Sequence, residues 1–301
     1  MQEGAFALID CLGFKGIWKR MKDGNPEPLI KKLQLINSEV QGNMVSNNGN
    51  HKLLSIDIKG INTNIKLLSD TVAISCQLQN PDNEKLTEIR KFYLIGVALS
   101  SIVIILELFI KDDPHLTMRG CITFGEHISD GNFIVGPAVD EAAEFEKLAQ
   151  GAFVWMHPSA ASIYNTVTDR IMTRFIDTNT NDKEINDPIK KELMRTYLRR
   201  IITCQLVSQE YEMPIKGGDY LQCPVLNPLL KGYSSKQHRQ QVIKAYSDAM
   251  TGNQLDVWLK KQNTMKFLQA AEDTLDKFIE ANSAFEEIGL SFTRISTLVL
   301  D

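Results

Sequence analysis

Two aspartates, each at the end of a largely apolar run, are the residues of this chain best suited to chemistry. Asp10 follows residues 6–9, and Asp70 lies in a turn between residues 65–68 and 71–74. Magnesium is usually held by one or two carboxylates together with the phosphates of its substrate. The pair predicts a site for a metal-bound nucleoside triphosphate. The alternative reading of each aspartate by itself is a helix cap or turn former.

A glycine turn directly after Asp10 supplies a second part of this site. Leu12, Gly13 and Phe14 lie between a predicted strand and a predicted helix. Backbone N–H groups at the N-terminus of a helix bind phosphate. We therefore expect these three residues to contact the phosphates of the substrate.

Four short motifs follow one another in a fixed order over roughly residues 4 to 160. They are Asp10-x-x-Gly13-Phe14, Lys66 to Asp70 with Ser69 before the aspartate, the strand Met118-Arg119-Gly120 to Gly125, and Gly136-Pro137-Ala138-Val139-Asp140 to Glu144. In order and spacing the motifs resemble those of the class III nucleotide cyclases, the fold of adenylate and guanylate cyclase catalytic domains. Ser69 departs from this pattern, because the family has glycine there.

The resemblance implies an α+β fold, a ferredoxin-like class III cyclase core in which helices pack on a sheet. Strands that alternate with helices favour the same layered arrangement. We expect a catalytic domain over residues 1-230 and a C-terminal helical extension over residues 231-301 packed on it. The expected strands are 5–10, 53–58, 61–68, 71–77, 116–124, 153–156 and an edge strand with its turn in 217–225; the expected helices are 29–40, 84–110, one from Pro137 and 189–207; the expected loops are 41–50 and 177–187.

The resemblance also implies roles for single residues. In a cyclase the ribose 3′-oxygen attacks the α-phosphorus and pyrophosphate leaves, with two divalent ions assisting. Asp10 and Asp70 are then the ligands of two Mg or Mn ions, and the carbonyl of Cys11 is a further candidate ligand.

The helix of the fourth motif departs from the family pattern. Asp140 stands at the position of the asparagine that orients the ribose, and Glu144 stands at the position of the arginine that stabilises the transition state. Lys147 lies about one helical turn beyond Glu144 and is one candidate to replace that arginine. Arg119 is the other candidate.

Base recognition is expected to differ from that of adenylate cyclases. Lys66 occupies the family's base-binding lysine position, but Phe133 stands where the family has an aspartate. A phenylalanine cannot accept a hydrogen bond from the adenine amino group. Together with Ser69-Asp70-Thr71 and His157-Pro158-Ser159, this combination resembles the pyrimidine cyclases of the bacterial Pycsar anti-phage systems. That resemblance implies that a homodimer makes cyclic UMP or cyclic CMP from UTP or CTP, and that the product activates a separate effector protein.

Two other functions remain open from the sequence. One is a purine cyclase. The other is a degenerate cyclase fold used as a nucleotide-sensing or dimerisation module, which the missing arginine favours. Retention of both aspartates argues against the degenerate module, because a carboxylate pair without metal would repel and cost stability.

Composition narrows the location and the partners of the protein. The chain of 301 residues has a net charge of −4 and no long lysine or arginine block, so we expect no nucleic-acid binding. Five cysteines without C-x-x-C spacing indicate reduced thiols in a cytoplasmic protein without a signal peptide. Residues 92–110 nearly match a membrane span in length, but we expect a buried core helix and no membrane insertion.

Overall fold

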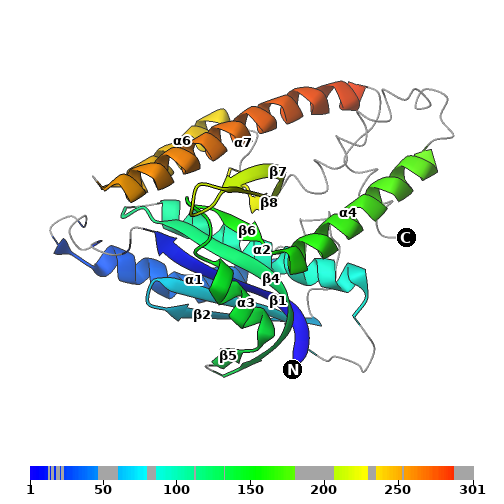
Figure 1. Ribbon diagram of the computed structural model, residues 1–301, viewed down its shortest axis with the longest axis horizontal. Helices are drawn as coiled ribbons and strands as arrows, with labels where there is room; N and C mark the ends of the chain where they lie inside the picture. The colour runs from blue at the N-terminus through cyan, green and yellow to red at the C-terminus, as the bar shows by residue number, and fades with distance from the viewer. Residues whose placement is uncertain are drawn as a thin grey trace.

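An eight-stranded sheet runs through the middle of the structure, and helices lie on both of its faces (Figure 1). The computed structural model describes residues 1–12, 14, 17, 21, 24–46, 60–79, 86–111, 113–131, 133–179, 207–229, 235–252 and 254–287. The strands are β1 (Gln2–Leu12), β2 (Ile61–Leu68), β3 (Thr71–Leu78), β4 (Thr117–Asp130), β5 (Phe133–Val135), β6 (Val154–Met156), β7 (Val207–Pro214) and β8 (Tyr220–Leu226). The helices are α1 (Glu27–Ser46), α2 (Glu88–Lys111), α3 (Pro137–Phe145), α4 (Pro158–Asn179), α6 (Lys236–Ala249) and α7 (Leu255–Glu287).

The first six elements form a ferredoxin-like unit. They follow one another as β1-α1-β2-β3-α2-β4, and their strands lie in the order β2-β3-β1-β4. Strand β1 pairs antiparallel with both β3 and β4, and β2 pairs antiparallel with β3. This is the split β-α-β topology. The prediction of an α+β, ferredoxin-like core is therefore confirmed.

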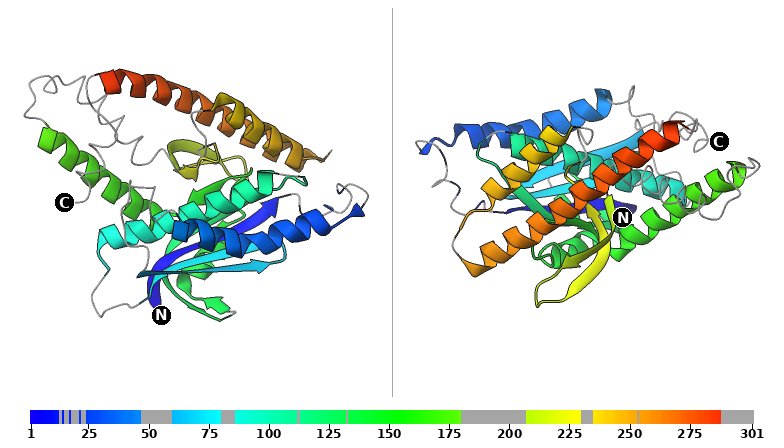
Figure 2. Two further views of the ribbon diagram at one scale, coloured as in Figure 1. Left: turned by 180° about the vertical axis from the view of Figure 1, so that it is seen from behind. Right: turned by 90° about the horizontal axis from the view of Figure 1, so that it is seen from above.

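The two faces of the central sheet are covered differently. Side chains alternate between the faces along a strand. Ala7 and Ile9 of β1 join the large core cluster that contains the inner side of α2. Phe6 points the other way and packs with Ala138 and Ala142 of α3 in a small cluster. The rear view in Figure 2 shows α1 and α2 together over the first of these faces.

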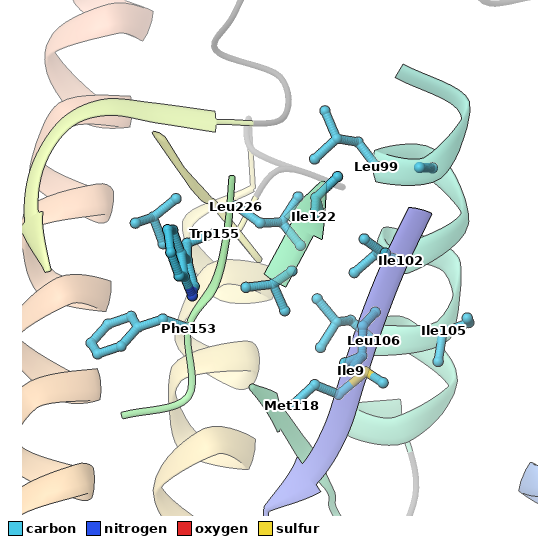
Figure 3. Close-up of a cluster of buried hydrophobic side chains, with 14 of the residues drawn as sticks. Ile9, Leu99, Ile102, Ile105, Leu106, Met118, Ile122, Phe153, Trp155 and Leu226 are labelled. Atoms are coloured by element: carbon cyan, nitrogen blue, oxygen red, sulfur yellow. The ribbon is translucent and has the colours of Figure 1, made fainter. Parts of the chain in front are cut away.

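Helix α2 is the main apolar layer of the core. Figure 3 shows Ile102 and Leu106 of α2 beside Ile9 of β1 and Met118 of β4. Among the described residues, α2 is the one helix that is long and apolar enough to cross a membrane, and 56% of its most apolar window is buried inside the structure. This packing agrees with the prediction of a core helix.

Several predicted element boundaries were wrong. Helix α1 continues to Ser46, so residues 41–46 are helical where a loop was expected. Strand β4 continues to Asp130 and turns into β5, a hairpin that the sequence did not reveal. Helix α4 includes residues 177–179 of the second expected loop. The expected strand 53–58 lies outside the described residues.

The region after residue 200 differs most from expectation. Val207 begins strand β7, so the predicted helix 189–207 is wrong at this end, and its other residues lie outside the described ones. The segment around Pro224 was predicted to be an edge strand, but β8 lies between β6 and β7. Strands β6 and β8 share a single register pair, Trp155 with Val225. Proline, which has no backbone N–H, is tolerated in β8 because few backbone hydrogen bonds to β6 have to be made.

Helix α7 packs against the β7 end of the sheet. The ring of Phe267 lies 5.4 Å from that of Phe153 and 4.6 Å from that of Tyr211, both in edge contacts. Arg239 of α6 forms an ion pair with Asp276 of α7, which joins the two helices. The C-terminal region is thus helical as expected, and the domain boundary at residue 230 stays a prediction.

A substitution at Gly120 tests how tightly β1 and β4 are packed. A Cβ atom at Gly120 would lie 2.3 Å from the carbonyl oxygen of Leu8, whereas one at Gly125 on the same strand would meet only Ala138, at 3.5 Å. We expect Gly120→Ala to lower the free energy of unfolding by about 1–3 kcal/mol, because β1 must shift. Gly125→Ala is the matched control, with an expected change of about 0.5 kcal/mol or less. Urea unfolding measures both, and equal effects of the two variants would show that the strands can separate without cost.

Candidate active site

The structure brings Asp10 and Asp70 together at one end of the central strands. Asp10 lies on β1 with Thr71 of β3 and Arg119 of β4 as its register partners. Asp70 lies in the two-residue turn that joins β2 to β3. The backbone N–H of Cys11 donates to the carbonyl oxygen of Asp70 at 2.8 Å, which ties this turn to β1. Both predicted metal ligands therefore belong to one site.

Ser69 has a backbone conformation that is usually adopted by glycine. Its φ angle is 62°, in the left-handed region that glycine adopts most easily. The tight β2–β3 turn requires this conformation, and the turn places Asp70 beside β1. Ser69 keeps the geometry of the turn at some conformational cost.

Asp10 lies in an environment that disfavours its negative charge. Burial raises the pKa of Asp10, and the neighbouring carboxylates of Asp70 and Glu146 add to this, while Arg119 opposes it. The Nη2 atom of Arg119 lies 3.1 Å from Oδ2 of Asp10, and the two side chains are 7% and 19% exposed. A divalent cation at this place would relieve the remaining carboxylate repulsion.

The donor set fits hard divalent ions that also bind a phosphate substrate. Among the described residues, no group of three or more His, Cys, Asp or Glu side chains gathers to hold a metal by itself. Two carboxylates with substrate phosphates are the arrangement that suits Mg²⁺. Burial raises the pKa of the Cys11 thiol, with Asp10 and Asp70 adding to the shift, so the thiol stays protonated. Cys11 can therefore offer its carbonyl but not a thiolate.

Cationic side chains flank this carboxylate pair on the β4 side. Arg119 is buried beside Asp10, and Lys147 follows helix α3 with its Nζ 3.0 Å from Glu146. Lys216 lies just after β7, and its backbone N–H donates to the carbonyl of Leu148 at 3.0 Å. Burial lowers the pKa of Lys216, and the positive charges of Arg119 and Lys147 contribute to the shift. Arg119, Lys147 and Lys216 thus form a group of positive charges on the β4 side of Asp10.

Lys216 was not identified from the sequence. The sequence feature that could have indicated Lys216 is its position directly before Gly217 and Gly218, two glycines with positive φ angles. A lysine at a glycine turn is common, and its position beside Arg119 depends on the pairing of β7 with a loop almost seventy residues earlier. Only the folded structure brings them together.

The glycine turn after β1 is described in part. Leu12 ends β1 opposite Thr117, and the carbonyl of Phe14 accepts a hydrogen bond from Ile17 at 3.0 Å. Both Leu12 and Phe14 pack against the core. Gly13 lies outside the described residues. Strand β1 continues beyond Asp10 to Leu12, so Leu12 belongs to the strand and not to a turn. Phosphate binding by Leu12, Gly13 and Phe14 stays a prediction.

The two residues predicted to recognise the base lie in different parts of the sheet. Lys66 pairs with Ala73, which pairs with Leu8, so Lys66 shares a face with Asp10, with their backbones roughly 12 Å apart across two strand spacings and two residues along the strand. Phe133 pairs with Asp130 and is 73% exposed. Its position lies at the far end of β4 from Arg119, roughly 35 Å along the strand. Phe133 is therefore remote from Asp10 within one chain.

Asp140 lies in the first turn of α3, and its backbone N–H donates to the carbonyl of Gly136 at 3.1 Å. Its side chain is exposed. The other end of α3 leads to Glu146, whose charge raises the pKa of Asp10. Within one chain, Asp140 therefore lies in the first turn of the helix whose other end leads to Glu146, near Asp10.

The His157-Pro158-Ser159 motif links three elements outside this site. Oε2 of Glu141 on α3 lies 3.1 Å from Nδ1 of His157 and accepts from Ser159 Oγ at 2.9 Å. Ser159 Oγ in turn accepts from the backbone N–H of Phe124 on β4 at 3.2 Å. Both Glu141 and Ser159 contact the same ring nitrogen, so the group is no hydrolase triad, which needs contacts to both ring nitrogens. It holds α3 and α4 against β4.

Comparison with known proteins gives partial likenesses only. No family model matches the chain, and no curated protein matches it. Among solved structures, the chain is similar to the guanylyl cyclase Cya2, with 13% identity over 54% of this chain and 78% of that one and a TM-score of 0.36. It is also similar to the adenylyl cyclase CyaB from P. aeruginosa, with 14% identity over 55% of this chain and 83% of that one and a TM-score of 0.36. Neither protein's activity is carried over to this chain.

A double-mutant cycle tests the Asp10–Arg119 ion pair in the metal-free protein. We expect Arg119→Met to lower the free energy of unfolding by about 1–3 kcal/mol, because it leaves a half-buried carboxylate without its counter-ion. Asp10→Asn in the Arg119→Met background should restore part of this loss. The same cycle on Lys244 and Asp248, a solvent-exposed pair, is the control and should give a coupling of about 0.5 kcal/mol or less. Equal coupling in the two cycles would contradict a structural role for the Asp10–Arg119 pair.

Proposed function

We propose that the chain is a nucleotide cyclase that converts UTP or CTP to the 3′,5′-cyclic nucleotide and pyrophosphate. The observation that carries this proposal is the position of Asp10 and Asp70 beside Arg119, whose charge acts, with that of Lys147, on Lys216. A carboxylate pair next to a group of cations suits a triphosphate whose charge is shared between metal ions and side chains. The ferredoxin-like topology and the four motifs support the same function.

In this proposal Asp10 and Asp70 hold two Mg or Mn ions. When bound, such ions lower the pKa of an attacking hydroxyl and neutralise charge on the leaving group. Arg119 has a donor available for this task, because its buried Nε has no hydrogen-bond partner among the described residues. We infer that Arg119 and Lys147 stabilise charge on the reacting phosphates in place of the arginine missing at Glu144. Lys216 binds the outer phosphates.

The choice of a pyrimidine base rests on two residues. Lys66 lies on the same face of the sheet as Asp10, at a distance that a nucleoside can span. Phe133 lacks the acceptor that adenine would need. Because Phe133 and Asp140 lie away from Asp10 in one chain, we propose a homodimer in which a second copy supplies them. A cytoplasmic location, a role in anti-phage defence and a separate effector activated by the product complete the proposal.

A catalytically degenerate cyclase fold is the second candidate function. The Asp10–Arg119 ion pair favours it, because an arginine can compensate Asp10 without a metal and so weakens the repulsion argument for activity. In that case the protein would bind a nucleotide without turnover.

Replacement of either aspartate tests the metal assignment. We expect Asp10→Ala and Asp70→Ala to reduce formation of the cyclic nucleotide by at least about 10³-fold, because each removes a metal ligand. Asp248→Ala, an exposed aspartate on α6, is the control and should keep full activity. The assay incubates each variant with all four ribonucleoside triphosphates and Mn²⁺ and identifies the products by mass spectrometry. Binding of nucleotide by the unaltered protein without any cyclic product would favour the degenerate fold.

Base preference is the second measurable consequence of the proposal. A pyrimidine presents O2 and either O4 or a 4-amino group, and Lys66 is a donor that can reach O2 or O4. We expect UTP or CTP to be cyclised much faster than ATP or GTP, and Lys66→Ala to lose most of this discrimination. Lys91→Ala, which removes a lysine paired with Glu3 and Glu88, is the control. If ATP were the best of the four substrates, the pyrimidine assignment would be wrong.

A further inference from the structure

The long C-terminal helix α7 meets the candidate site through one loop. This loop, residues 146–153, connects α3 to β6 and is named here the α3–β6 loop. Asn263 Nδ2 donates to the carbonyl of Gln150 at 2.8 Å, and the backbone N–H of Ala152 donates to Oγ1 of Thr264 at 2.8 Å. Thr264 Oγ1 also donates to the carbonyl of Lys260 at 2.7 Å. One face of α7, from Lys260 to Thr264, is therefore fixed to the loop.

The same loop is bound on its other side by the end of β7. The backbone N–H of Gln150 donates to the carbonyl of Pro214 at 2.9 Å, and that of Lys216 donates to the carbonyl of Leu148. Figure 1 shows α7 running above β7, with the sheet below. The α3–β6 loop thus lies between β7 and α7. Any charge at the start of α7 is held close to the charges that follow β7.

Four cationic side chains are gathered around the α3–β6 loop. Lys147 lies in the loop, Lys216 is bonded to it, and Arg119 precedes Gly120, whose backbone N–H donates to the carbonyl of Phe153 at 3.0 Å. Lys260 of α7 is the fourth. The positive charge of Lys260 contributes to lowering the pKa of Lys216, after burial and Arg119, which agrees with this proximity.

Three acidic side chains form ion pairs with three of these four cations, and the charge of Asp256 also acts on the fourth, Lys216. Arg119 is paired with Asp10 and Lys147 with Glu146. Lys260 is paired with Asp256 one turn earlier, at 2.5 Å. Lys216 has no ion-pair partner in the part of the chain that the structure describes. A multiply charged anion would relieve the repulsion among these cations, and Asp10 would exchange part of its contact with Arg119 for metal ions.

We propose that Lys260 of α7 belongs to the polyphosphate-binding group of the site and contacts the terminal phosphate of the bound triphosphate together with Lys216. This inference rests on the proposed function for the identity of the substrate, but the ligand chemistry is any inorganic or organic triphosphate. Asp256 competes with that phosphate for Lys260. The helical region after β8 is then a part of the site itself.

A surface pair with the same spacing separates this role from ordinary helix stabilisation. An aspartate and a lysine four residues apart commonly pair on helices. Asp248 and Lys244 form such a pair on α6, where the lysine side chain is 80% exposed. The Lys260 side chain is only 19% exposed, although it lies near the start of α7. Lys244 is therefore the matched control for Lys260.

Binding of inorganic tripolyphosphate with Mg²⁺ to the full chain tests the proposal by calorimetry at low salt. We expect Lys260→Ala to weaken binding by about tenfold, since a charge-assisted contact is lost. Asp256→Asn should strengthen binding by severalfold because it removes the competing carboxylate. Lys244→Ala should leave the affinity within about twofold. Thermal unfolding checks that each variant is folded, and Lys260→Gln replaces Lys260→Ala if the latter is not.

The outcomes distinguish this inference from the proposed cyclase function. Lys260-dependent binding of tripolyphosphate without any cyclic product from the four nucleotides would support the phosphate site and reject the cyclase. Formation of a cyclic nucleotide with equal tripolyphosphate affinity for Lys260→Ala and Lys244→Ala would overturn the role of Lys260 alone. Absence of tripolyphosphate binding by the unaltered protein would likewise overturn it. In an active enzyme, Lys260→Ala is expected to raise the KM for the nucleotide about tenfold.

Discussion

The contact between Asp10 and Arg119 across β1 and β4 is the interaction on which the candidate site depends. It joins the adjacent strands β1 and β4 of the ferredoxin-like unit at the end where Asp10 and Asp70 lie. Both groups are largely removed from water, and such a pair is stable only while each charge has its partner. The close approach at Gly120, the next residue on β4, allows β1 to lie near enough for this contact. The chemistry of the site and the packing of the sheet are therefore set by the same few backbone positions.

The parts of the site that were predictable from the sequence are those made by neighbouring residues. Asp10 ends an apolar run, and Asp70 lies in a hairpin turn whose two strands were both predicted, so each carboxylate could be placed at a strand end. The ferredoxin-like order of the first strands was likewise predicted, from the resemblance carried by those motifs. The elements that lie beside these strands in the folded chain could not be predicted. Lys216 reaches the site only because β7 pairs with the α3–β6 loop, and no local pattern encodes that pairing.

The errors in the fold have the same physical origin. Pro224 suggested an edge strand because proline cannot donate to a ladder, but the short overlap of β6 and β8 removes most of that constraint. The asparagine-rich end of α1 suggested a loop, yet the helix continues through residues 41–46. Phe133 lies at the far end of β4 from Arg119, so its predicted place at the base, which stays a prediction, requires a second copy of the chain. Local preference is weak wherever tertiary pairing decides the outcome.

The position of the α3–β6 loop between β7 and α7 has a consequence for the order in which the protein is assembled. Contacts between segments far apart in sequence close late, because the entropy of long loops must be overcome first. During synthesis the N-terminal strands emerge before β7 and α7, so the ferredoxin-like unit can form while the loop still lacks both of its covers. A nascent chain at that stage would already hold Asp10 and Asp70 in register. It would gather Lys216 and Lys260 around the α3–β6 loop only after α7 had left the ribosome and docked.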